Sequence, residues 1–196
     1  MTDIRNVSTS THNLANLAEK IAPATNPAAP VLSPPQLQTL QSLATQLRQS
    51  PAVEVLQTGT ITLFTGPDTS AKTVAAQTLA ANLHRDLYRI DLSAIVSKYA
   101  ADTSNALTQL LHSAATSGAI LFFDEADALF GKRTHIKDSH DRYASQSTGD
   151  PNDGSSLLQI LQQYPGITIL AISSMDDWNP AQLAHTHTTL KFPPTP

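Results

Sequence analysis

The chain has 196 residues, of which 40% are hydrophobic and 14% are charged, and its 12 Lys+Arg against 16 Asp+Glu leave a formal net charge of −4. This length suits one domain with an appendage and excludes two large domains, and the hydrophobic share is sufficient for a core, which excludes global disorder. No segment concentrates basic charge, so nucleic acid is disfavoured as a partner, and the zero Cys count excludes disulfides and thiolate zinc sites.

Residues 1–35 are predicted to be a flexible N-terminal segment and a Pro-rich linker. The opening stretch lacks a signal-peptide core, and no run reaches the roughly 18 apolar residues of a membrane span, so we expect a soluble, cytoplasmic protein without a membrane partner. Leu14, Leu17 and Ile21 have helical spacing, but the stretch is short, and disorder is favoured over a marginal helix. Prolines at 23, 27, 30, 34 and 35 favour an extended linker, so a single domain is predicted at 36–196.

The rest of the chain alternates helical stretches with short apolar runs. Ser33 followed by two prolines predicts a helix start, and leucines at 37, 40, 43 and 47 share one face of that helix. Further helices are predicted from about Lys72 and over 107–115. The apolar runs, which are typical of buried parallel strands, cover residues 61–65, 87–90, 119–123, 167–172 and 190–192. This order predicts an α/β fold with an open parallel sheet and helices on both faces.

A phosphate-loop pattern follows the first of these strands. The pattern G-x-x-x-x-G-K-[ST] is matched by Gly66, Pro67, Asp68, Thr69, Ser70, Ala71, Lys72 and Thr73, with Ala71 in place of the second glycine. Backbone N–H groups of such a loop cradle the phosphates of ATP, while Lys72 would reach the outer phosphates and the Thr73 hydroxyl would bind Mg²⁺. A glycine-like backbone at Ala71 would cost about 1–2 kcal/mol and weaken binding roughly 5- to 30-fold. The alternative is an ordinary strand-turn-helix whose polar side chains are merely exposed.

Two carboxylates follow the third predicted strand. Asp124 and Glu125 come directly after the apolar run 119–123, and open α/β sheets bind ligands at this end of their strands. This is a Walker B arrangement, in which Asp124 would hold the hydrated Mg²⁺ and Glu125 would act as the catalytic base for water. The alternative is a strand that ends in a solvated acidic turn.

From about Val31 onward the chain resembles an AAA+ ATPase core, and it looks closest to the ATPases associated with phage-tail-like contractile injection systems. The stretches that carry this likeness are LFTGP, DLYRIDLSAIVSKY, SGAILFFDEADALFGKR and KDSHDRYA. The resemblance implies a three-layer P-loop NTPase fold with sheet order 5-1-4-3-2. It also implies ATP bound between subunits of a homo- or hetero-oligomeric ring, and a protein client gripped at Tyr99.

Several positions depart from the family pattern. Thr69 and Ala71 stand where the family has glycine. The pore segment, which in the family is Tyr-apolar-Gly, keeps the aromatic Tyr99 but has Ala100 and Ala101 after it and so loses the glycine. The stretch 145–156 is an insertion. Met175 falls at the position of the polar sensor-1 residue, and a thioether cannot hydrogen-bond a lytic water strongly.

The C-terminal part departs further from the family. Where the family carries paired arginines, this chain reads Leu183, Ala184, His185, Thr186 and His187, and a largely neutral His cannot replace a fixed guanidinium. The chain stops at Pro196, before the helical lid of the family, so the fold is expected without that lid.

Two functions follow from these residues. The first is an ATP-binding AAA+ protein with weak or no hydrolysis, which uses Lys72, Thr73, Asp124 and Glu125. The alternative is a non-catalytic pseudo-ATPase that acts as a structural or regulatory subunit of a ring or injection-system assembly. A nucleotide kinase is less favoured because no acceptor-binding or lid segment is visible. The paired histidines, Arg133 and Arg142 receive no metal-binding or catalytic role, and Trp178 is expected to pack against the last strand.

Overall fold

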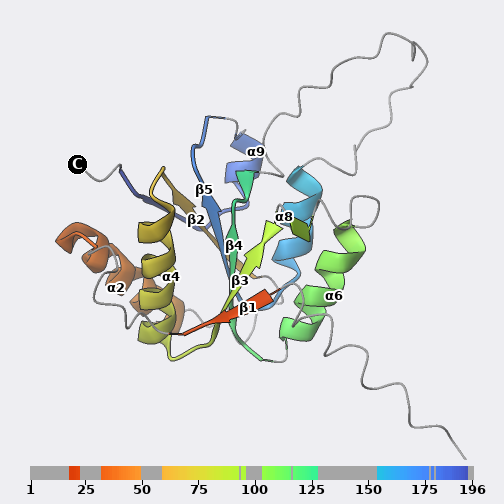
Figure 1. Cartoon of the computed structure of the whole chain (residues 1–196), viewed down its shortest axis with the longest axis horizontal. Helices are drawn as coiled ribbons and strands as arrows, with labels where there is room; N and C mark the ends of the chain where they lie inside the picture. Colours follow the sequence, from red (N-terminus) through yellow and green to blue (C-terminus); the bar gives the residue numbers. More distant parts are fainter. Residues whose placement is uncertain are drawn as a thin grey trace, which may run out of the picture.

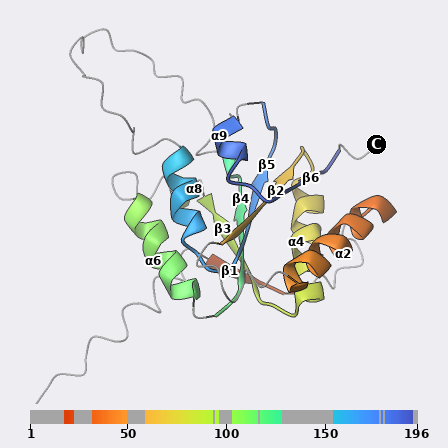
Figure 2. The same ribbon diagram turned by 180° about the vertical axis from the view of Figure 1, so that it is seen from behind.

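The computed structural model describes residues 18–22, 32–49, 59–92, 94–95, 103–115, 117–127, 154–176, 178 and 180–193. These residues form one mixed sheet with helices on both faces (Figure 1, Figure 2). None of the helices within these ranges is both long and apolar enough to cross a bilayer.

The sheet has six strands in the order β1-β3-β4-β5-β2-β6. The strands are β1 (Ala18–Ile21), β2 (Thr60–Thr65), β3 (Leu87–Asp91), β4 (Ile120–Asp124), β5 (Ile167–Ile172) and β6 (Thr188–Lys191). All neighbours pair in parallel except β1 and β3, which pair antiparallel. Counted in chain order, the five parallel strands stand as 5-1-4-3-2. The fold class and strand order implied by the resemblance are therefore confirmed.

Helices cover the two faces of the sheet in pairs (Figure 1, Figure 2). The helices are α2 (Pro34–Gln49), α4 (Thr69–Leu83), α6 (Thr103–Ala115), α8 (Gly154–Gln162) and the short α9 (Pro180–Leu183). One core cluster joins α2 and α4 to residues such as Phe64 and Phe122, and the other joins α6 and α8 to residues such as Leu63 and Phe123. Successive residues of a strand point to opposite faces, so each buried strand supplies both clusters.

Strand β1 lies inside the segment that was expected to be flexible, and the expectation of disorder or a marginal helix is wrong for Ala18–Ile21. The stretch pairs with β3, from Ala18 opposite Ile90 to Ile21 opposite Leu87. The Lys20 ammonium also contacts the Asp86 carboxylate at 2.8 Å. Without β1, the backbone groups at the β3 edge would lack partners, and this pairing outweighs the weak local preference for a helix. The division between a linker and a domain near residue 35 stays a prediction.

Two further differences concern packing and boundaries. Trp178 is buried in the α6–α8 cluster, whereas the last strand, β6, contributes to the other cluster. Its predicted packing against β6 is therefore wrong. Helix α4 begins at Thr69, three residues before the predicted start at Lys72, because the Asp68 side chain caps it.

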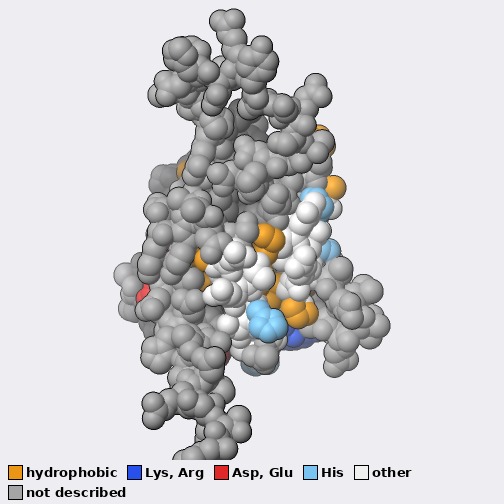
Figure 3. Space-filling model, turned by 90° about the vertical axis from the view of Figure 1, so that its right-hand side faces the viewer, with side chains coloured by type: hydrophobic (Ala, Val, Ile, Leu, Met, Phe, Trp, Pro, Cys, Tyr) orange, Lys and Arg blue, Asp and Glu red, His pale blue; other side chains and the backbone are white. Residues whose placement is uncertain are grey.

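Figure 3 shows the side of the molecule that carries α6, and among the described residues few charged side chains are visible there, with hydrophobic and His side chains scattered between uncoloured groups. Among the positions of α6 whose exposure the structure describes, the exposed ones are Asn105, Thr108, Gln109 and His112.

Candidate functional site

The candidate site is a cavity where β2, β4 and β5 end. It has a volume of about 260 Å³ and is lined by Thr69, Lys72, Asp124, Glu125, Asp127, Ala171 and Ser173. The phosphate-loop lysine and both predicted acidic residues therefore face the same hollow. This convergence follows from topology, because the carboxyl ends of neighbouring parallel strands meet at one edge of the sheet.

The first half of the phosphate loop depends on Gly66. Its φ is +140°, and a Cβ at this position would lie 1.9 Å from the backbone oxygen of Phe192. Only glycine fits both the backbone angle and the close approach of the chain after β6. The first glycine of the pattern is therefore required by the fold itself, whether or not a nucleotide binds.

The second half of the loop is the first turn of α4. Asp68 is the N-cap residue, and its Oδ1 accepts a hydrogen bond from the Ala71 N–H at 2.9 Å. Ala71 is the third residue of the helix, and its φ is not positive; among the described non-glycine residues, only His84 and Glu125 have a positive φ. The glycine-like backbone considered for Ala71 does not occur, so the associated 1–2 kcal/mol penalty does not apply here.

Lys72 is buried beneath the loop. Its Nζ donates hydrogen bonds to the carbonyl oxygens of Gly66 at 2.8 Å and Ile172 at 2.9 Å, which ties the loop to the end of β5. Burial lowers the pKa of Lys72 from its usual value, and the nearby carboxylates of Asp127 and Asp124 oppose that shift. The ammonium group thus lies between loop and sheet, where it is shielded from water and hydrogen-bonded to two backbone carbonyl oxygens.

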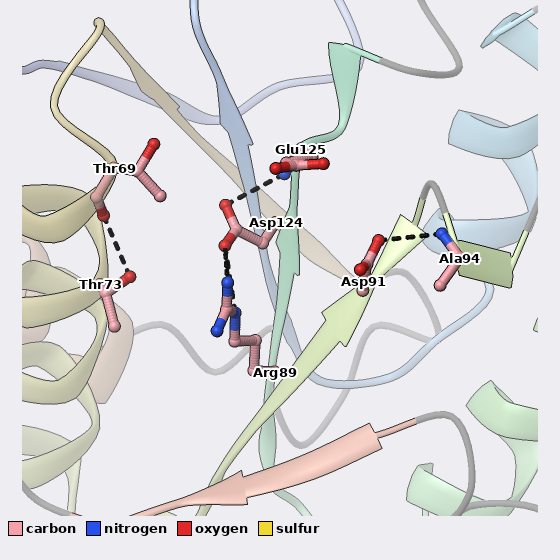
Figure 4. Close-up of polar contacts among 7 residues, drawn as sticks. All are labelled: Thr69, Thr73, Arg89, Asp91, Ala94, Asp124 and Glu125. Atoms are coloured by element: carbon pink, nitrogen blue, oxygen red, sulfur yellow. Dashed lines mark hydrogen bonds and ion pairs between the residues drawn. The ribbon is translucent and has the colours of Figure 1, made fainter.

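The other loop residues divide into two groups. Thr69 lines the cavity, whereas Thr73 does not, and the Thr73 hydroxyl donates to the Thr69 carbonyl oxygen at 3.0 Å (Figure 4). That bond lies within the helix and leaves the Thr73 oxygen able to accept another group. Pro67 and Ser70 are exposed and line no part of the cavity.

Asp124 lies at the end of β4 with a side chain that is only 3% exposed. Its Oδ2 accepts from Arg89 Nη2 at 2.5 Å and from Arg89 Nε at 3.1 Å, and its Oδ1 accepts from the Glu125 N–H at 3.0 Å (Figure 4). Glu125 has a φ of +52°, in the left-handed region that is unusual for a non-glycine residue, and its side chain is exposed at the cavity. Strained backbone of this kind clusters at functional sites.

Sequence reasoning missed Arg89. In the register of β3 and β4, Arg89 lies opposite Phe122, on the sheet face that α4 covers, and Asp124 points to the same face. A signal was available, since a basic residue inside the short apolar strand 87–90 calls for a partner on a neighbouring strand.

Asp127 and Ser173 were also missed. Asp127 carboxylate oxygens accept from the Ser173 N–H at 2.8 and 3.1 Å and from its hydroxyl at 3.0 Å. The predicted sensor-1 position, Met175, is wrong for this structure, because its side chain packs against the α6–α8 cluster while Ser173 lines the cavity. Since β5 ends at Ile172, the first residue beyond the strand is the one that faces the site.

The residues present fit the phosphate end of a magnesium nucleotide. The cavity and its rim offer an ammonium, carboxylates and hydroxyls, which suit phosphate oxygens and a hard cation. Among the described residues no three His, Asp or Glu side chains cluster as an independent metal site. A cation here would therefore depend on nucleotide oxygens and water for most of its ligands, as Mg²⁺ usually does.

Several residues singled out in the sequence either form hydrogen bonds away from the cavity or lie outside the described residues. His185 Nδ1 lies 2.8 Å from Gln162 Nε2, and His187 Nδ1 accepts from the Ile61 N–H at 3.1 Å, so both histidines have structural hydrogen bonds. The pore segment with Tyr99, the arginines at 133 and 142, the histidines at 135 and 140, and residues 145–153 of the insertion lie outside the described residues. The last three residues of that insertion begin α8.

A larger cavity of about 650 Å³ lies between β1 and the C-terminal end of α4. It contains none of the predicted site residues. Its charged groups include Lys20 and Asp86, which form an ion pair with each other. The smaller cavity at the carboxyl end of the sheet is therefore the better candidate for chemistry.

A family profile and individual known proteins both match the part of the chain that contains the site. A family profile described as "ATPase family associated with various cellular activities (AAA)" matches residues 62–186. A Sinorhizobium fredii (strain NBRC 101917 / NGR234) protein described as an uncharacterized AAA family ATPase is 32% identical over 117 residues, which cover 59% of this chain and 36% of that one. The Dictyostelium discoideum 26S proteasome regulatory subunit 10B is 28% identical over 110 residues, which cover 56% of this chain and 26% of that one.

Among solved structures, the crystal structure of the FIGL-1 AAA domain aligns with a TM-score of 0.64 at 12% identity, covering 95% of this chain and 61% of that one. At that identity the likeness concerns the fold alone. The chain spans about a third or less of the length of the two curated relatives above.

Proposed function

The chain belongs to the AAA family of ATPases, and on that premise we propose that its cavity binds the phosphate end of ATP with Mg²⁺, at reduced affinity and with little or no hydrolysis. One observation carries the proposal. Lys72 from α4 and the adjacent pair Asp124 and Glu125 at the end of β4, which lie about 50 residues apart in the chain, line a single cavity at the carboxyl end of the sheet.

Each residue has a distinct role in this proposal. Lys72 would exchange its two carbonyl partners for phosphate oxygens, and the first N–H groups of α4 would face the same anion. Asp124 and the Thr73 hydroxyl would hold Mg²⁺, directly or through water. When bound, the cation withdraws negative charge from the phosphate oxygens. A carboxylate oxygen of Glu125 would orient a water and take up its proton.

The same geometry supports reduced affinity. The cavity is lined by three carboxylates, from Asp124, Glu125 and Asp127, and by the ammonium of Lys72. With the Arg89 guanidinium that pairs with Asp124 included, the carboxylates still outnumber the cations, so an incoming polyphosphate meets net negative charge. Asp68 already accepts from the Ala71 N–H, one of the donors at the helix start. A nucleotide must displace these internal contacts before it gains its own.

The runner-up is a pseudo-ATPase, and one observation favours it. His185, in the segment where the resemblance places paired arginines, is half-buried, and its Nδ1 lies 2.8 Å from Gln162 Nε2 of the same domain. In that case the domain would serve as a structural or regulatory subunit of a ring. Ring assembly, a protein client at Tyr99, a cytoplasmic location and a role with contractile injection systems are proposals too, and the last rests only on the sequence stretches that resemble those ATPases.

The test is a titration of the purified chain with a fluorescent ATP analogue and Mg²⁺, with phosphate release measured in parallel. Lys72→Ala should abolish binding, and Glu125→Gln should leave binding intact while removing any turnover. Lys20→Ala, which removes an exposed lysine paired with Asp86, is the matched control and should bind like the wild type. Binding with turnover that depends on Glu125 would eliminate the pseudo-ATPase. No binding at millimolar nucleotide would reject the nucleotide proposal altogether.

A further inference from the structure

The Asp124 carboxylate already has a cation beside it. Arg89 approaches Oδ2 with two N–H groups, at 2.5 and 3.1 Å, and the pair lies on the sheet face that α4 covers. In Figure 4 the guanidinium points from β3 toward Asp124, in the region between β4 and the helix that carries Thr73. Arg89 is therefore close to the place where Asp124 and Thr73 would hold a metal ion.

Most of the acceptor capacity of Asp124 is used. A carboxylate offers about four lone-pair directions, and here Oδ2 takes two N–H groups from Arg89 while Oδ1 takes the N–H of Glu125. A metal ion or its bound water must use the one remaining direction or displace the guanidinium. Two like charges on one carboxylate also repel each other in a partly desolvated site.

The two partners differ in their freedom to move. The Asp124 side chain is 3% exposed and is held by the β4 backbone, whereas the Arg89 side chain is 42% exposed. Release of the carboxylate therefore requires the guanidinium to swing toward solvent while Asp124 stays in place.

We propose that Arg89 acts as an internal counter-ion that occupies Asp124, opposes divalent-cation binding and so sets the cation requirement of this site. The inference rests on the proposed function, because it takes Asp124 as the residue that faces the metal ion. Arg89 is a positioning residue in this account, since it acts through Asp124 and does not itself line the cavity.

The experiment titrates the full chain with Mn²⁺ alone and follows the signal of the free ion by electron paramagnetic resonance. Arg89→Gln should bind Mn²⁺ at least tenfold more tightly than the wild type. Arg89→Lys should gain at least threefold, because an ammonium cannot reproduce the two-pronged contact. Arg85→Gln removes the same charge from a residue that donates to the Gly118 carbonyl oxygen, and it should leave the affinity unchanged.

Two further variants make the test decisive. Arg89→Gln combined with Asp124→Asn should lose the gain, and a gain that persists there would overturn the proposal because the ion would be bound elsewhere. Circular dichroism shows whether Arg89→Gln folds. If it does not, the Mn²⁺ affinity of Arg89→Lys tests the proposal instead, and a gain in that affinity below threefold overturns it. A parallel titration with fluorescent ADP separates nucleotide binding from the effect of Arg89 on cation binding. If the wild type binds no nucleotide, the proposed function is rejected, but the Mn²⁺ affinities of wild type and variants still test the role of Arg89.

Discussion

Tyr164 allows a stability prediction whose size follows from the structure. Its hydroxyl donates to the Ala119 carbonyl oxygen at 2.6 Å, and the residue is buried in the core beside β4. Burial raises the pKa of Tyr164 to about 12 from its ordinary 10.0, against a smaller opposing effect of Arg85. The folded protein therefore holds this proton more tightly than the unfolded chain does.

The sign and magnitude follow by linkage. Below pH 10 the Tyr164 hydroxyl is protonated in both the folded and the unfolded protein, and its full contribution to the free energy of unfolding is present. Between pH 10 and about 12 the unfolded chain loses this proton first, so the free energy of unfolding falls. Two pKa units correspond to roughly 2.7 kcal/mol lost across that interval. Tyr164→Phe removes the titrating group, and at neutral pH it should cost about 1–2 kcal/mol because the Ala119 carbonyl loses its partner.

The assay is urea unfolding at several pH values from 8 to 11.5, with the free energy of unfolding compared between wild type and variant. The variant should start less stable and should decline less steeply above pH 10, so the two curves converge. Tyr88→Phe, which keeps Tyr164, serves as control and should follow the wild-type slope. Parallel curves for Tyr164→Phe and wild type would refute the assignment of the alkaline loss to this hydroxyl.

Three other substitutions test separate parts of the argument. Gly66→Ala should destabilise the domain by about 2 kcal/mol or more, because its Cβ would meet the Phe192 backbone at 1.9 Å. A variant that unfolds at the same temperature as the wild type would contradict the loop geometry. Thr168→Val should stabilise the domain by about 1 kcal/mol, since its buried hydroxyl has no hydrogen-bond partner among the described residues, and calorimetry should show a higher Tm. Ala71→Gly should cost about 1 kcal/mol of stability and change nucleotide affinity less than fivefold, because Ala71 is helical; a larger gain in fluorescent-ATP binding would show that its methyl group obstructs the phosphate.

The sequence predicted the parts of the molecule that depend on local pattern and chain order. Apolar runs without alternation indicated buried parallel strands, and the rule that such strands present their carboxyl ends together placed Lys72 and Asp124 at one edge. The remaining features depend on pairing across the sheet. Nothing local in AEKI indicates a strand, because β1 exists only through its bonds to β3.

Side-chain partners were harder still to predict. The contact of Arg89 with Asp124 requires the relative register of two strands and the direction of both side chains, which spacing along one chain does not specify. The choice between Ser173 and Met175 depended on where β5 ends, and boundaries are the least determined property of a predicted strand. The roles of the phosphate-loop and acidic residues in binding stay predictions until the titrations are done.

Strand β1 also has a practical consequence for anyone who shortens this protein. A fragment that begins at α2 would keep every residue of the candidate site but would leave β3 as an uncovered outer strand with free amide and carbonyl groups. Such a strand is a template for pairing with another molecule, so the shortened protein should self-associate more readily than the full chain. Loss of monodispersity in that fragment would therefore say nothing about ring assembly, and nucleotide studies should retain residues 18–22.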